Sequence, residues 1–245
     1  MRYYLTDNVI INESKMYYLK DKEKQITKNN WHTLLKDYGW EKMYLPWIKQ
    51  LNKLSTKKQK NSLYGMYDCP SDGNCFFHCI ANALKERDRY SENYYDQADI
   101  RKLIAESITE EDFKILMSYY RIMKDANDFE EEWDPYKIQN IDDFKSKIIK
   151  SGHCYWGDYL LLNLIVKKLR LNIMIINYDQ EDKDYSIYNT LIEYNPDYDS
   201  IFLIYENKCH FKLLGYFDNL MKSYFTDNNI PEELSKLFNL KNLKY

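Results

Sequence analysis

A cysteine follows a glycine-containing loop and begins a helix-like stretch at residues 71–78, Ser-Asp-Gly-Asn-Cys-Phe-Phe-His. Cys75 would lie in the first helical turn, where the helix dipole and the free backbone N–H groups favour an ionised sulfur. Gly73 has no Cβ, so the backbone there can approach a substrate carbonyl closely. The N–H groups around Asp72 and Cys75 could then stabilise an oxyanion. These residues predict a thiol nucleophile at the start of a helix.

A histidine that could serve as the base follows far downstream. His210 begins a short apolar stretch at residues 210–214, soon after another at residues 200–205. A nucleophilic cysteine with a distant histidine is the arrangement of thiol hydrolases. In this interpretation His210 takes the proton of Cys75, and the side chain of Asp72 holds the loop.

Three ordered segments resemble the ovarian-tumour (OTU) family of cysteine proteases, most of which are deubiquitinating enzymes. The first segment is residues 71–78, the second is residues 155–158 (Tyr-Trp-Gly-Asp), and the third is the pair His210 and Phe211. The resemblance covers roughly residues 64–216, a normal length for one domain.

The resemblance implies a deubiquitinating thiol protease that needs no metal and no organic cofactor. Its expected partner is ubiquitin, a polyubiquitin chain or a ubiquitin-like modifier, cut at the isopeptide bond of the C-terminal glycine. The implied site residues are catalytic Asp72, Cys75 and His210, oxyanion and loop support from Gly73 and Asn74, and groove residues Trp156 and Gly157.

One position departs from the family pattern. Family members commonly carry Asn or Asp two residues after the histidine, where it orients the imidazole, and here that residue is Lys212. On a strand Lys212 would lie beside His210, where an ammonium disfavours imidazolium and cannot accept its N–H. The orienting group could instead be one of four others: Asn207, Asp68, Asp37 or Glu41. Otherwise the enzyme would run as a weak Cys–His dyad. The alternative function is a ubiquitin-binding scaffold with weakened catalysis.

Composition argues against several other classes. The 245 residues include 35 basic and 38 acidic ones, which are interspersed, so we expect no nucleic-acid partner. We also expect no membrane association, because no apolar run approaches the about 20 residues of a membrane span. The first residues lack a signal-peptide pattern. The expected location is therefore intracellular and cytoplasmic, in the producing cell or in an infected host cell.

The five cysteines form no Cys-x-x-Cys pair, and their odd number argues against a disulfide framework. Cys69, Cys75, His78 and Cys79 cluster in the sequence, but their spacing matches no zinc module. The papain-type nucleophile motif Cys-Gly-Ser-Cys-Trp is also absent. We expect neither a metal site nor a papain-type active site.

The chain divides into three stretches. Residues 1–62 are interpreted as an N-terminal helical extension, with short amphipathic helices broken at Pro46. Residues 63–216 would form the OTU-like catalytic domain, and residues 217–245 a C-terminal helical segment with Pro231 in its first turn. Helices first and strands later favour an α+β fold, with a small, mostly antiparallel sheet flanked by helices.

Periodicity and turn residues place the elements of the catalytic domain. Expected helices cover residues 75–86, 96–108, 110–123, 141–149 and 158–169, the last capped by Asp158. Expected strands cover residues 172–176, 185–188, 200–205 and 210–214. The nucleophile would then lie at a helix N-terminus and the base at the start of a strand.

Overall fold

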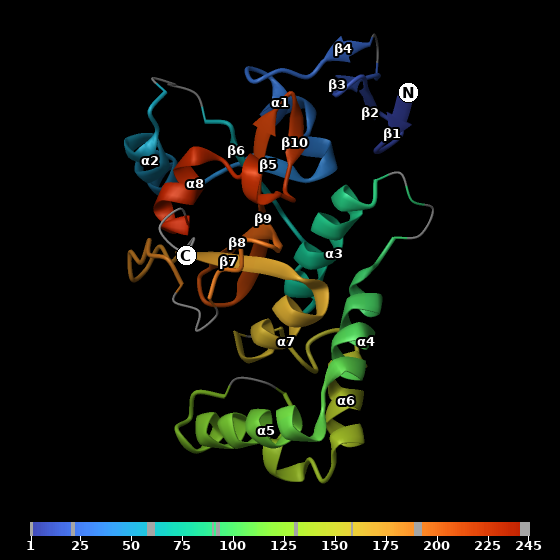
Figure 1. Cartoon of the computed structure of the whole chain (residues 1–245), viewed down its shortest axis with the longest axis vertical. Coiled ribbons are helices and arrows are strands. Elements are labelled where there is room, and N and C mark those ends of the chain that lie inside the picture. The colour runs from blue at the N-terminus through green and yellow to red at the C-terminus, as the bar shows by residue number, and fades with distance from the viewer. Residues whose placement is uncertain are drawn as a thin grey trace.

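A six-stranded sheet with helices on both faces forms the centre of the fold (Figure 1). The structure is a computed structural model that describes residues 2–20, 23–57, 62–89, 91, 94–129, 132–157, 159–188 and 193–240. The described residues form an α+β fold, as predicted, and all neighbouring strands of the main sheet except one pair are antiparallel.

The main sheet has the strand order β5-β6-β9-β8-β7, with β10 paired to β9, and only β7 and β8 run parallel. Its strands are β5 (Trp40–Lys42), β6 (Tyr64–Tyr67), β7 (Leu171–Tyr178), β8 (Asp199–Glu206), β9 (His210–Asp218) and β10 (Leu220–Lys222). A tight turn at residues 207–209 joins β8 to β9, because Glu206 pairs with His210. The turn therefore places His210 at the start of a central strand.

Capping residues account for where three helices of the OTU-like region begin. The side chain of Asp96 caps α4, that of Thr109 caps α5 and that of Asn140 caps α6, each by accepting a backbone N–H. These helices are α3 (Cys75–Arg87), α4 (Gln97–Ser107), α5 (Glu110–Asp125), α6 (Ile141–Ile149) and α7 (Tyr159–Leu169). The predicted cap of α7, Asp158, lies outside the described residues.

Each face of the sheet has its own hydrophobic core, and strand β8 shows the alternation. Ile201 and Leu203 pack with the buried side chains of α3, α4 and α7. Phe202 and Ile204 pack on the other face with residues of α2 (Leu45–Leu54) and α8 (Glu232–Leu237). In Figure 1, α4, α5 and α6 extend away from the sheet at the end opposite the N-terminus.

The structure differs from the predicted helical extension over residues 1–62. An antiparallel sheet begins the chain, formed by β1 (Arg2–Tyr4), β2 (Val9–Asn12), β3 (Lys15–Tyr18) and β4 (Lys24–Gln25). Glu13 and Ser14 connect β2 to β3 with positive φ angles of 49° and 63°. Turns of this kind usually carry Asn or Gly, so the hairpin has no sequence signal here.

Helices do occur later in that stretch, as α1 (Trp31–Leu34) and α2. Pro46 lies in the first turn of α2 instead of breaking a helix, since the N–H that proline lacks is not needed there. Strand β5 pairs with β6, and Trp47 and Leu51 of α2 share a core with Leu234 of α8. All three predicted stretches therefore contribute to one folded unit.

Two other expectations differ from the structure. Residues 185–188 form no strand, only an isolated bridge between Ile176 and Ile187. The C-terminal stretch begins with β-structure, because β9 continues to Asp218 and β10 follows it. The helix α8 begins directly after Pro231, which is its N-cap.

Candidate active site

Cys75 is the first residue of α3, and the loop after β6 leads into it. Phe76, Phe77, Cys79 and Ile80 are buried along the helix, which packs against β9. This packing fixes the helix N-terminus at the start of β9. The sulfur of Cys75 accepts the backbone N–H of Phe211 at 3.4 Å, so it lies next to the residue that follows His210.

The loop before Cys75 requires glycine at position 73. Gly73 has φ +80°, and a Cβ there would lie 2.5 Å from the carbonyl carbon of Gly152. The Asp72 carboxylate accepts the N–H of Asn74 at 3.0 Å and lies 3.3 Å from His78 Nε2. Burial opposes ionisation of Asp72, but the hydrogen bonds with Asn74 and His78 outweigh it and lower its pKa. Asp72 therefore holds the loop as a carboxylate.

Asn74 is buried and connects the nucleophile loop to a second loop. Its Oδ1 accepts the N–H of Gly152 at 3.1 Å and Nε of Arg101 at 2.9 Å. Arg101 is fully buried on α4 and also donates to the carbonyls of Gly73 (3.1 Å) and Tyr155 (2.9 Å). One arginine thus joins α4, the 72–75 loop and the 152–155 loop.

Arg101 was not predicted as a site residue, although the sequence pattern around it indicates a buried position. On a helix it shares a face with Ile104, Ala105 and Ile108, which are all buried. A charged residue on an apolar face indicates a buried polar network, because an unpartnered buried charge is costly.

The pKa of Cys75 is not lowered, although a helix N-terminus usually lowers the pKa of a cysteine. Burial raises the pKa of the Cys75 thiol above its ordinary value, and the N–H of Phe211 only partly offsets this. Desolvation therefore outweighs the backbone hydrogen bonds to the sulfur and favours the thiol. A base is needed to generate the thiolate.

His210 lies with Nε2 3.4 Å from Oδ1 of Asp68, one of the four orienting groups considered from the sequence. The separation is an ion-pair distance without full hydrogen-bond geometry, and Nε2 is buried with no other partner in the described part of the chain. Lys212 contacts Asp68 as well, at 3.3 Å, and Glu41 at 3.1 Å. The lysine is thus surrounded by acidic groups instead of facing the imidazole alone.

A cavity of about 650 Å³ brings most of the predicted site residues together. Gly73, Cys75, Trp156, Gly157 and His210 line it. Asp72 and Asn74 are not among its lining residues. Both support the loop from behind.

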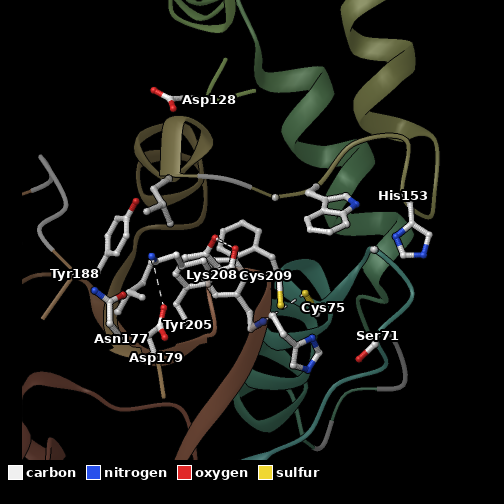
Figure 2. A pocket seen from close by; sticks show the side chains of 18 of the residues that line it. Ser71, Cys75, Asp128, His153, Asn177, Asp179, Tyr188, Tyr205, Lys208 and Cys209 are labelled. Carbon is white, nitrogen blue, oxygen red and sulfur yellow. Dashed lines mark hydrogen bonds and ion pairs between the residues drawn. The ribbon is translucent and has the colours of Figure 1, made fainter. Parts of the chain in front are cut away.

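The cavity extends well beyond Cys75. In Figure 2, Cys75 lies toward Ser71 and His153, whereas Asn177 and Asp179 lie toward the other side. Helix α5 and the residues after it add further lining side chains, including Tyr120, Met123, Asp128 and Phe129.

Close packing requires glycine at position 157, one of the predicted groove residues. A Cβ at this position would lie 2.1 Å from the ring of Phe76, without any positive φ. Glycine therefore lets the 156–157 segment approach α3 directly. This contact places Trp156, which is partly exposed, at the wall of the cavity.

Three other cysteines differ from Cys75 in burial. Cys69 and Cys79 are buried, with their sulfurs 3.4 Å apart, and Cys209 is exposed. Within the described ranges, no group of three or more His, Cys, Asp or Glu side chains could hold a metal ion.

The sequence pattern of the OTU-like cysteine protease family matches residues 70–211, more than half of the chain. The chain belongs to the OTU-like cysteine protease family. The matched region begins just before the 72–75 loop and ends at Phe211, directly after His210. A comparison with curated protein sequences finds no match.

Solved OTU structures are similar to this chain at low identity. The OTU domain of Hazara virus bound to ubiquitin is 16% identical, with 63% of this chain and 82% of that chain covered and a TM-score of 0.39. An OTU domain in complex with ubiquitin is 18% identical (74% and 85% covered, TM-score 0.41). An OTU deubiquitinase from Wolbachia pipientis is 12% identical (71% and 96% covered, TM-score 0.39).

No helix within the described residues is both long and apolar enough to span a membrane.

Proposed function

We propose that this protein is a deubiquitinating cysteine protease with Cys75 as the nucleophile and His210 as the general base. The observation that carries the proposal is the position of Cys75 at the start of α3, in one cavity with His210. Membership in the OTU-like family supports ubiquitin, or a ubiquitin-like modifier, as the substrate.

In the proposed reaction, the imidazole of His210 accepts the thiol proton of Cys75. The sulfur attacks the carbonyl carbon of the modifier's C-terminal glycine, and the carbonyl oxygen becomes an oxyanion. The N–H of Cys75 is free of an acceptor within its helix, because the first N–H groups of a helix have none. Together with N–H groups of the 72–75 loop it stabilises the oxyanion, worth roughly 3 kcal/mol per donor.

The intermediate collapses when the C–N bond breaks. The imidazolium of His210 gives its proton to the departing lysine amine, leaving a thioester on Cys75. His210 then takes a proton from water, whose oxygen attacks the thioester carbonyl. The C–S bond then breaks, and the imidazolium of His210 returns its proton to the sulfur. The modifier leaves with a free carboxylate, and the thiol of Cys75 is restored.

A ubiquitin derivative with a thiol-reactive group at its C-terminus tests the proposal. We expect a covalent adduct with the full chain that the Cys75→Ala variant does not form. Cys209→Ala is the matched control, because Cys209 is exposed and lines the same cavity. An adduct that survives Cys75→Ala and is lost in Cys209→Ala would refute the assignment.

The same experiment separates the enzyme from a scaffold and ubiquitin from other modifiers. Tight binding of ubiquitin without an adduct would support the scaffold alternative. An adduct formed only with a ubiquitin-like modifier would keep the chemistry of Cys75 and change the substrate.

A further inference from the structure

Strand register brings a lysine and an aspartate together beside His210. On β6 and β9, Tyr67 pairs with Leu213, so the next residue, Asp68, follows β6 opposite Lys212. Side chains two residues apart on a strand share a face, which places Lys212 and His210 together. Register alone thus predicts a cluster of these three side chains.

The contacts agree with the register. Oδ1 of Asp68 lies 3.3 Å from Nζ of Lys212 and 3.4 Å from Nε2 of His210. The same oxygen atom therefore faces both the ammonium and the imidazole. In the part of the chain that the structure describes, Asp68 is the only acidic group within ion-pair distance of His210.

Besides Asp68, three other groups contact the ammonium of Lys212. Its side chain is only 10% exposed, and Nζ lies 3.1 Å from Glu41 of β5, 3.3 Å from Glu206 of β8 and 3.0 Å from the Tyr44 hydroxyl. Tyr44 donates in turn to Glu206 and stacks on Tyr178.

The charge balance of this cluster favours a cationic lysine. Burial opposes the charge, but the hydrogen bonds to Tyr44 and Glu41 and the nearby Glu206 carboxylate outweigh it and raise the pKa of Lys212. With Asp68 included, three carboxylates face this one ammonium. Without the lysine, three negative charges would be left facing one another.

Asp68 itself needs such an anchor. Its backbone N–H donates to the Gly39 carbonyl at 3.1 Å, but its side chain is 57% exposed. An exposed carboxylate on a fixed backbone can rotate into solvent. The buried ammonium of Lys212 lies 3.3 Å from its Oδ1.

We propose that Lys212 is a positioning residue that holds Asp68 as the acceptor for the Nε2–H of His210. This inference rests on the proposed function and deepens it. Lys212 takes the place of the Asn or Asp that would orient the histidine directly, and the acceptor comes from the neighbouring strand. An Nε2–H held by Asp68 leaves Nδ1 unprotonated and able to accept the proton of Cys75.

The tautomer of His210 tests the arrangement without any substrate. The chain has 4 histidines, so ¹⁵N imidazole signals can be assigned with a His210→Gln variant. We expect the Nε2–H tautomer in the unmodified protein and a mixed tautomer in Asp68→Ala and in Lys212→Met. Glu41→Gln is the matched control, since it removes another partner of Lys212 that does not contact His210, and it should leave the tautomer unchanged.

Kinetics with a ubiquitin conjugate give the second readout. We expect Asp68→Ala and Lys212→Met each to lower kcat at least about tenfold at unchanged KM. In a Lys212→Asn background, the new side-chain amide can itself accept the Nε2–H of His210. Adding Asp68→Ala to this background should therefore change kcat less than twofold. A purely structural role for Lys212 would predict that the two substitutions lower kcat independently, so that their fold-changes multiply in the double variant.

The two readouts separate this inference from the proposed function. An unchanged tautomer in both Asp68→Ala and Lys212→Met would overturn the inference, even if the protein cleaves ubiquitin conjugates. A tautomer that depends on both residues in a protein inert toward every modifier would support the inference and refute the proposed function.

Discussion

At the scale of single residues, the state of Cys75 is set by two opposing effects. The helix N-terminus and the N–H of Phe211 favour the thiolate, while burial favours the thiol. Burial is the larger effect, so the Cys75 thiol keeps its proton unless a base removes it. In the proposed mechanism that base is His210.

The pH dependence of alkylation follows from the raised pKa of Cys75. Only the thiolate reacts, so its alkylation by iodoacetamide should be slow at pH 7 and rise about tenfold per pH unit past the usual thiol pKa near 8.5. Mass spectrometry must assign the modified site, because Cys209 is exposed and will react as well. A plateau for Cys75 below pH 7 would show a preformed thiolate–imidazolium pair and contradict this account.

Two glycines allow the cost of a left-handed backbone conformation to be measured separately from the cost of a steric clash. Gly73 and Gly152 have similar φ angles, +80° and +90°, but only at Gly73 would a Cβ collide with backbone. Gly152→Ala should cost about 1–2 kcal/mol of unfolding free energy, the cost of a left-handed residue. Gly73→Ala should cost more and also reduce adduct formation at least about a hundredfold, since the nucleophile loop must move.

Urea denaturation and the rate of probe labelling measure the two effects. Equal losses of stability and labelling in the two variants would mean that the contact between Gly73 and the Gly152 peptide does not shape the site.

Sequence alone could predict the local part of this site and not the distant part. The Gly73–Cys75 loop is contiguous, so its chemistry is visible in residue order. Asp68 was one of four open choices, because only strand register shows which carboxylate faces His210. Lys212 was expected to oppose an imidazolium, since the carboxylates around it come from other strands.

At the scale of elements, α4 is tied to the active-site loops through Arg101. The guanidinium donates to carbonyls of both loops and to that of Ile148 at the end of α6, and it lies 4.0 Å from the ring centroid of Phe77. The two walls of the cavity near Cys75 are therefore linked to one helix.

Replacing this arginine should loosen both loops at once. Arg101→Met leaves several buried carbonyls without their donor, at roughly 1–3 kcal/mol each, so we expect a large loss of unfolding free energy by urea denaturation. Lys102→Met on the same helix removes an exposed charge and should cost less than about 0.5 kcal/mol. Similar losses in the two variants would refute a structural role for the buried arginine.

Helices were more predictable than strands in this chain. The helices α3 to α7 are each nine or more residues long and show apolar periodicity, and α4, α5 and α6 also have capping side chains. Their positions therefore follow from the sequence. Strand β6 has four residues with Gly65 among them, and β5 has three. Strands this short carry too little alternation to be recognised, although β6 positions Asp68.

At the scale of the whole molecule, the N-terminal stretch is part of the catalytic fold. Trp47 is fully buried in the core on one face of the sheet, and its indole N–H donates to the Asn177 carbonyl at 2.7 Å. Residues from both ends of the chain meet in this core, which contains Leu51 of α2 and Leu234 of α8. We infer that unfolding is cooperative across the chain.

A pair of substitutions on α2 tests this inference. Trp47→Ala should cost about 3–5 kcal/mol and lower the midpoint of the single thermal transition. Leu45→Ala on the same helix should change stability by less than about 0.5 kcal/mol, because Leu45 is 60% exposed. A Trp47→Ala variant that melts in two steps, with the catalytic part unaffected, would show that residues 1–62 fold separately.

Hydrolysis of isopeptide-linked diubiquitin by this chain tests the central claim most directly. The account predicts release of monomeric ubiquitin with repeated turnover, abolished in Cys75→Ala and in His210→Ala and retained in Cys209→Ala. Undiminished hydrolysis in Cys75→Ala or in His210→Ala would contradict it, as would a folded protein that cleaves no ubiquitin or ubiquitin-like conjugate.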